Sequence, residues 1–113
     1  MLNRYAAKYA LNSPKGVQRL LGDYHHLYAR RIDKSDFPAS DILMDLRLAI
    51  AKAGLTDRQR QALALHFIKL KTQEEVALEM DGISQVGVYY HIQGALKRVA
   101  KVYEGWEYGL YNV

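Results

Sequence analysis

The chain has 113 residues, half of them hydrophobic, with no cysteine and a formal net charge of +4 at neutral pH. A chain of this length can bury one hydrophobic core but not two, and the lack of cysteine excludes disulfides and cysteine-ligated zinc fingers. It has no apolar run of membrane-spanning length and no signal-peptide pattern, so we expect a soluble, cytoplasmic protein with no membrane partner.

The first region, residues 1–34, is predicted to form a basic helical arm. Within residues 1–31, six lysine and arginine residues stand against Asp23 as the one acidic residue, which gives this stretch a net charge of +5 and leaves −1 for the rest of the chain. Such an arm can attract nucleic-acid phosphates or an acidic protein. Spread-out charges of this kind are equally typical of ordinary solvated helices.

Helices are expected in this arm near residues 2–11 and 16–31. Pro14 suits a helix start, because its fixed φ is already helical. Four tyrosines fall into pairs with a spacing of four residues, which places each pair on one helix face: Tyr5 with Tyr9, and Tyr24 with Tyr28. Helix packing is favoured for these rings over base stacking, since stacking side chains usually adjoin a basic groove.

The segment 33–40 contains turn-forming residues, a proline and the potential helix cap Ser40, and is predicted to be a linker. The second region, residues 39–104, should hold four helices, near residues 41–53, 57–70, 73–81 and 85–104. Thr56 should cap the second of these. Within that helix, Leu63, Phe67 and Leu70 repeat at helical spacing. No alternating strand pattern appears, so the predicted fold class is all-α, a small helical domain.

A capping box is predicted at the start of the third helix of this region. Thr72 can accept a hydrogen bond from the amide of Glu75, while the Glu75 carboxylate accepts one from the amide of Thr72. The buried stripe of the helix should consist of Val76, Ala77 and Met80. Ala77 is expected at the closest approach to the next helix, where a larger side chain would hold the backbones apart. Glu74 should lie on the solvent side.

Gly82 and Ser84 predict a tight turn before the last helix. Gly82 adopts positive φ at little steric cost, and Ser84 is suited to cap a helix that begins at Gln85. Together the two helices and their turn predict a helix-turn-helix, which presents its second helix to duplex DNA. Four residues separate Ala77 from Gly82, where most such motifs have three. A turn one residue longer, or tilted, is therefore expected.

The last predicted helix has two distinct faces at 100° per residue. Its core face should contain Val88, Ile92, Ala95, Leu96, Val99, Val102 and Tyr103. The opposite face, which we assign to DNA, contains Val86, Tyr90, Gln93, Gly94, Lys97 and Lys101, with Tyr89 and Arg98 on its flanks. Gln93 can pair with adenine edges, and Val86 and Tyr90 can contact thymine methyl groups. The cations Lys97, Arg98 and Lys101 can meet phosphates, and Gly94 should let the DNA backbone approach closely.

The segment 105–113 is predicted to be an aromatic tail, interrupted by glycines, that folds back or stays free for a partner. Residues suited to catalysis are scarce. His25 and His26 are neighbours and point about 100° apart on a helix, unlike the two ligands of a helical metal site. His91 suits packing or a phosphate contact, and no glycine-rich phosphate loop is present. We therefore expect no enzymatic activity, no cofactor and no metal.

The segment from Ala39 to Val102 resembles region 4 of bacterial sigma factors, which reads the minus-35 promoter element and docks on the flap of the RNA polymerase β subunit. The resemblance lies in three runs that occur in this order: LTDRQRQALALHF, TQEEVALEM and GISQVGVYYHIQGALKRV. It implies that the base-reading residues are Gln85, Val86, Tyr89, Tyr90 and Gln93. It also implies that Thr72 and Gln73 are the phosphate-contacting start of the support helix. Sigma factors usually carry arginine and glutamate early in the reading helix, whereas this chain has Gln85, Val86 and Gly87, so a different target is expected.

The chain is too short for the sigma-factor region that melts the minus-10 element. It is similar in form to small phage and mobile-element transcription regulators, including the autolysin-regulatory family of late-gene activators. This resemblance implies a sequence-specific regulator that binds double-stranded DNA and contacts RNA polymerase. Two alternatives remain open: a DNA-packaging or replication adaptor with the same motif, and a protein-interaction mimic of region 4 that binds polymerase or an anti-sigma protein. The target sequence, the sense of regulation and the oligomeric state do not follow from the sequence.

Overall fold

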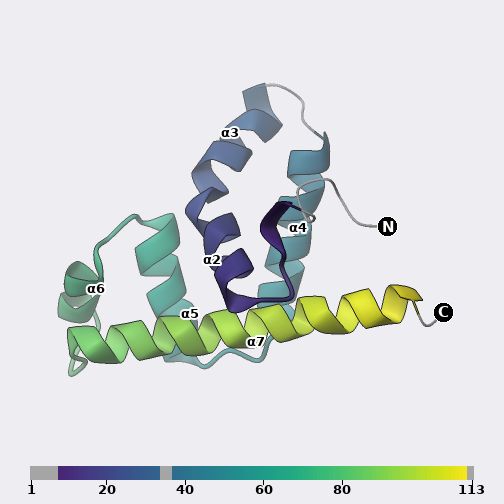
Figure 1. Ribbon diagram of the computed structural model, residues 1–113. Coiled ribbons are helices and arrows are strands. Elements are labelled where there is room, and N and C mark those ends of the chain that lie inside the picture. The colour runs from purple at the N-terminus through teal and green to yellow at the C-terminus, as the bar shows by residue number, and fades with distance from the viewer. Residues whose placement is uncertain (1–7, 34–36, 112–113) are drawn as a thin grey trace.

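The longest helix, α7, spans Gln85–Tyr111 and forms the base on which the other helices stand (Figure 1). The computed structural model describes residues 8–33 and 37–111, and these contain six α-helices, one π-helical turn and no strand. The remaining elements are α2 (Pro14–Gly22), α3 (Tyr24–Asp33), α4 (Phe37–Lys52), α5 (Asp57–Leu63), the π-helical turn η1 (Ala64–Ile68) and α6 (Gln73–Glu79). The predicted all-α fold class is confirmed.

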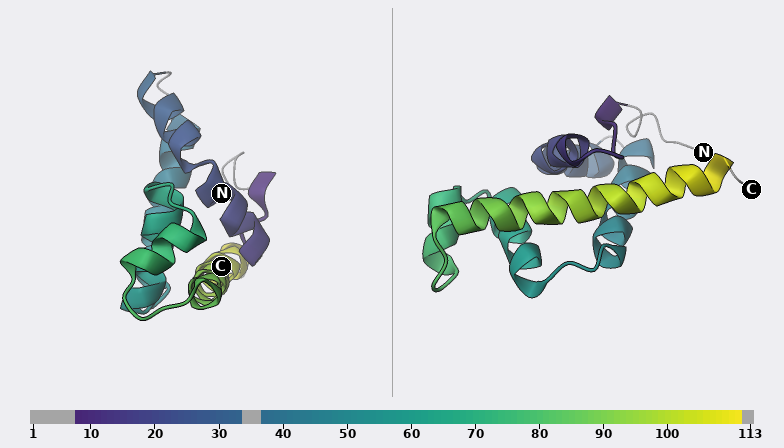
Figure 2. Two further views of the ribbon diagram at one scale, coloured as in Figure 1. Left: turned by 90° about the vertical axis from the view of Figure 1, so that its left-hand side faces the viewer. Right: turned by 60° about the horizontal axis from the view of Figure 1, so that its bottom comes forward.

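α7 joins two groups of helices. α5 and α6 pack near its N-terminal end, and α2 and α4 pack farther along it (Figures 1 and 2). α3 packs on α4, and the α3–α4 tip stands away from α7. One continuous core includes Leu20 and Leu27 from the N-terminal helices as well as Ile92 and Leu96 from α7. The basic N-terminal helices therefore belong to the same packed body as the predicted helix-turn-helix.

The predicted helix over residues 16–31 is in fact two helices, with a break at Asp23. α2 begins after Ser13, whose Oγ accepts a hydrogen bond from the Gly16 amide at 3.1 Å, and Pro14 occupies its first turn as predicted. The Asp23 carboxylate accepts a hydrogen bond from the hydroxyl of buried Tyr9 at 2.7 Å. A buried tyrosine thus holds the corner between α2 and α3.

The tyrosine pair of α3 is confirmed. The rings of Tyr24 and Tyr28 stack with their centroids 6.2 Å apart. Most of the predicted helix over residues 2–11, Tyr5 included, lies outside the described residues.

Two predicted boundaries are wrong. Residues 37–40, assigned to a linker, form the first turn of α4, so Ser40 lies inside the helix rather than at its cap. Its hydroxyl accepts a hydrogen bond from Arg31 Nε at 3.2 Å, which joins this turn to α3. The segment after Glu104 continues α7 through Tyr111 in spite of its glycines. Trp106 packs edge to face on Tyr103, with 5.2 Å between ring centroids, and so supports the added turns.

The predicted helix over residues 57–70 is right at its start and wrong at its end. Thr56 caps α5 in a complete capping box with Gln59. The α-helix then gives way to η1, and Leu70 leaves it with φ 59°. Leu70 does not continue the repeat of Leu63 and Phe67: it is 71% exposed, because the π-helical turn rotates the chain before this residue is reached.

Two histidines hold the corner between η1 and α6. Nε2 of His25 lies 2.9 Å from the carbonyl oxygen of Ile68, and Nδ1 of His66 lies 2.8 Å from that of Lys71. Since a carbonyl oxygen only accepts, each of these ring nitrogens donates. None of the helices within the described ranges has the length and apolarity that spanning a bilayer requires.

Candidate nucleic-acid interface

α6 and α7 form the helical hairpin that the sequence predicts. Both hydrogen bonds of the capping box are present: the Glu75 amide donates to Thr72 Oγ1 at 3.1 Å, and the Thr72 amide donates to Glu75 Oε1 at 2.9 Å. Hydrogen bonding to the backbone of Thr72, and then to its side chain, holds the pKa of the Glu75 carboxyl below its usual value. Val76 and Met80 are buried, and Ala77 is half-buried against the core. The start and the inner face of α6 are as predicted.

The turn between the two helices also follows the prediction. Gly82 has φ 77°, and Ser84 Oγ accepts a hydrogen bond from the Gly87 amide at 3.0 Å, which caps α7. Residues 80–84 connect the two helices. The spacing that is one residue longer than usual is accommodated in this connection.

The core face of α7 is confirmed. Val88, Ile92, Ala95, Leu96, Val99 and Tyr103 are buried, and Val102 is half-buried against them. Because this face is fixed by packing, the orientation of the opposite face is fixed as well. Whatever the first turns of α7 present to the outside is therefore determined by the hydrophobic pattern of the helix.

The residues predicted to read bases differ in exposure. Val86 is 62% exposed, Tyr90 68% and Tyr89 46%. The two tyrosine rings meet edge to face with centroids 5.5 Å apart, and Gln85 is exposed beside them. Gln93, two turns farther along, is half-buried. The first turns of α7 thus present an aromatic and apolar surface to the surroundings.

Gly94 does not face open space, contrary to the prediction. A Cβ added to Gly94 would come within 2.8 Å of Gln59 Nε2 in α5. The other end of that amide is held, because Gln59 Oε1 accepts a hydrogen bond from the Thr56 amide at 3.0 Å. The glycine therefore allows α5 and α7 to pack closely, and it is not a place for DNA to approach.

The cations of α7 have different surroundings. Lys97 and Lys101 are exposed and share the face that carries Val86 and Tyr90. Arg98 is also exposed, but its Nη1 donates to the carbonyl oxygen of Gly54 at 2.6 Å. Arg98 thus links α7 to the connection between α4 and α5, a contact that the helical pattern of α7 could not reveal. The guanidinium has further N–H donors that point elsewhere.

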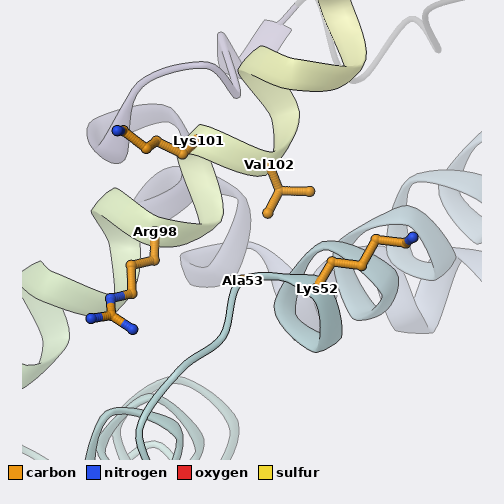
Figure 3. Close-up of a pocket in the computed structure, with 5 residues that line it drawn as sticks. All are labelled: Lys52, Ala53, Arg98, Lys101 and Val102. Atoms are coloured by element: carbon orange, nitrogen blue, oxygen red, sulfur yellow. The ribbon is translucent and has the colours of Figure 1, made fainter. Parts of the chain in front are cut away.

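A shallow hollow of about 300 Å³ lies between the end of α4 and α7. Figure 3 shows Lys52, Arg98 and Lys101 at its borders, with Ala53 and Val102 between them and the charged groups pointing in different directions. Charges that diverge do not enclose one small anion. They suit an extended polyanion, whose phosphates are themselves spread out. Lys52 was missed from the sequence because only the fold brings the end of α4 beside α7.

The start of α6 is acidic by comparison. Thr72 is exposed and Gln73 half-buried, but the exposed carboxylates of Glu74 and Glu75 occupy the same turn. Lys71 forms an ion pair with a third carboxylate, that of Glu79, at 3.1 Å. Carboxylates repel other anions, so the positive charge of the α6–α7 hairpin lies with the cations of α7 and not at the start of α6.

Within the described ranges, no group of three or more histidine, cysteine, aspartate or glutamate residues could hold a metal ion. Comparisons with models of protein families, with curated proteins and with solved structures yielded no match.

Proposed function

We propose that this protein is a transcription regulator that binds duplex DNA in a sequence-specific manner through the α6–α7 helix-turn-helix. The observation that carries the proposal is the exposed surface of Val86, Tyr89 and Tyr90 at the start of α7, directly after the Gly82 turn. Large apolar side chains are costly to leave in water. All three lie near the same end of α7, on the side that faces away from the core. This is the part of a helix-turn-helix that enters the major groove.

The chemistry of this surface suits the major groove. Val86 and Tyr90 are apolar contacts for thymine methyl groups, and the Gln85 amide can both donate to and accept from base edges. Gln93 can do the same for adenine where its half-buried side chain reaches the groove. These residues favour DNA sites that are rich in A·T pairs. Many other DNA-binding proteins instead recognise guanine through bidentate contacts from arginine.

The phosphate contacts of the proposal are Lys97, Lys101, Arg98 and Lys52. Arg98 and Lys101 lie 13 and 16 residues beyond Gln85, so at about 1.5 Å per residue they are roughly 20 to 24 Å farther along the helix axis. A helix of this length extends beyond the groove that its first turns occupy. Its cations then meet the sugar–phosphate backbone at the groove edge. Thr72 and Gln73 contribute hydrogen bonds rather than charge.

Contact with RNA polymerase is the part of the proposal that rests on the resemblance to sigma-factor region 4 alone. The exposed aromatic surface of α7 would serve a region-4 mimic equally well, if that mimic bound protein instead of DNA. The two functions differ in their response to salt, since a protein that neutralises phosphates releases counterions and loses affinity steeply as salt rises.

The experiment is a titration of the full chain against random and genomic duplexes at several salt concentrations. Lys101→Ala should weaken binding to all duplexes about equally and flatten the logarithmic salt slope by about one unit. The matched control is Lys15→Ala, which removes the same charge from the exposed side of α2 and should leave the slope unchanged. Absence of salt-dependent binding would overturn the proposal in favour of the mimic.

A further inference from the structure

Exposed apolar side chains gather at a second place, on α3 and α4. Tyr28 and Ile32 of α3 are four residues apart, and Phe37, Met44 and Leu48 of α4 lie within about 40° of one another at 100° per residue. All five are exposed, from 42% for Tyr28 to 76% for Phe37. Tyr28 and Met44 line one shallow hollow between the two helices, which joins these residues into a single α3–α4 surface.

The α4 stripe has an acidic edge and a basic edge. Asp41 and Asp45 fall on one side of it, and Arg47 falls on the other. Arg31 of α3 joins the basic edge, because its Nε donates to Ser40 Oγ. Partial burial and the neighbouring charge of Asp41 raise the pKa of the Asp45 carboxyl, so the acidic edge holds two carboxylates that repel each other.

We propose that the α3–α4 surface binds a second copy of this chain, with the two α4 helices parallel and related by a two-fold axis that runs along them. Such an axis brings the acidic edge of one copy against the basic edge of the other at the same height. Arg31 of α3 is hydrogen-bonded to Ser40, the residue before Asp41, so Arg31 and Asp41 lie at nearly the same height along α4. Asp41 therefore meets Arg31 of the second copy, and Asp45 meets Arg47.

The antiparallel arrangement is disfavoured by the same charges. A two-fold axis perpendicular to the helices keeps each edge on its own side, and acidic residues then face acidic residues. The contact also removes the exposed apolar stripe from water. Monomeric proteins rarely expose large contiguous apolar patches. Charge and apolar area thus favour the same parallel pair.

The parallel arrangement has a consequence for DNA binding, and this consequence rests on the proposed function. α4 runs from the tip of the molecule toward α7, so an axis along α4 places both copies of α7 at the same end of the pair (Figure 1). Two reading helices at one end can occupy two halves of a symmetric duplex site. The self-association itself requires no DNA.

The first test is the mass of the full chain in solution without DNA, measured by sedimentation equilibrium. The wild-type chain should be a dimer, and Met44→Glu should raise the dissociation constant of the dimer by about a hundredfold, as expected for a charge at the centre of an interface. Leu78→Glu is the matched control, because Leu78 is even more exposed but lies on α6, and it should remain dimeric. A monomeric wild-type chain, including one whose own residues 1–7 cover the stripe, would overturn the proposal.

The second test exchanges charges between two exposed residues, and its double variant separates a charge effect from the loss of the Arg31–Ser40 hydrogen bond. Asp41→Arg and Arg31→Asp should each weaken the dimer about tenfold, and the chain carrying both should regain most of the loss. A double variant weaker than either single variant would show that these edges do not face each other. Neither measurement includes DNA. A chain that does not dimerise could therefore still read DNA, and a chain that does not bind DNA could still dimerise.

Discussion

The α6–α7 and α3–α4 hairpins of this protein are specified in different ways. In the first, three helix ends are determined by residues within a few positions: the start of α6 by the Thr72–Glu75 box, its end by Gly82, and the start of α7 by the Ser84 cap. In the second, the start of α4 is held by contacts with another helix, through Arg31 and buried Ala39. A helix boundary that is determined locally can therefore be predicted from sequence, whereas one that is determined by tertiary contact cannot.

The largest expected effect tests tertiary specification at a third place, the start of α2. Gly16 lies where α2 meets the preceding segment, and a Cβ there would overlap the backbone carbonyl oxygens of Tyr9 and Ala10. Backbone atoms cannot move aside as a flexible side chain can. Gly16→Ala should therefore lower the free energy of unfolding by about 3 kcal/mol, measured by urea denaturation.

Gly22 provides the control in the same helix. A Cβ at Gly22 would meet nothing within 4 Å, so Gly22→Ala should be neutral or stabilise by up to about 1 kcal/mol. Equal effects at the two glycines would mean that α2 does not pack on the preceding segment as described, and the contrast between local and tertiary specification would lose its clearest example.

These glycines mark the limit of prediction from sequence. Helix periodicity predicted the core face of α7 except for buried Ala100, and the capping signals predicted α6 and its turn, because both depend on neighbouring residues. The same reasoning misplaced Gly94 and Leu70 and missed Lys52. Gly94 packs on Gln59, Leu70 follows a π-helical turn, and Lys52 borders α7 only in the folded chain. Each error concerns a contact between residues that are remote in sequence or a local change of helix type.

The second prediction tests the α6–α7 hairpin itself. Ala77 is half-buried where α6 packs on the core, and Ala77→Leu adds three carbons there. The variant should lose about 1 to 3 kcal/mol of stability through overpacking, and its DNA binding should fall with it. Glu74 is exposed on the same helix, so Glu74→Ala should change stability by no more than about 0.5 kcal/mol. Thermal melts that reverse this order would contradict the assigned faces of α6.

The third prediction concerns the place where α7 meets α4. The hydroxyl of Tyr103 is buried and has no hydrogen-bond partner among the described residues. Its pKa is raised, mainly by burial and to a smaller extent by the negative charge of Asp45. Removing a buried polar group without a partner relieves its desolvation cost. Tyr103→Phe should therefore raise the free energy of unfolding by about 1 kcal/mol. A loss of similar size would indicate that the hydroxyl is hydrogen-bonded after all.

The smallest expected effect is the pH dependence of the α6 capping box. The folded-state pKa of Glu75 is below its usual value, so its contribution to stability is present at neutral pH and is lost as pH falls below the usual glutamate range and through the lowered pKa. Glu75→Gln retains the box geometry but does not titrate. The difference in Tm between wild type and this variant should shrink between neutral and acidic pH. A Tm difference that stays constant with pH would show that the charge of the Glu75 carboxylate does not contribute to stability.

If the start of α7 reads bases, the duplexes that the full chain retains from a random pool should reveal it when they are sequenced. The wild-type chain should enrich one motif, and Tyr90→Ala should relax preference at one position of that motif by about 1 to 3 kcal/mol while leaving the others intact. Tyr90 is largely exposed, so the variant should fold normally. Retention of duplexes without any shared motif, or an identical motif from both proteins, would contradict the claim that this surface reads DNA.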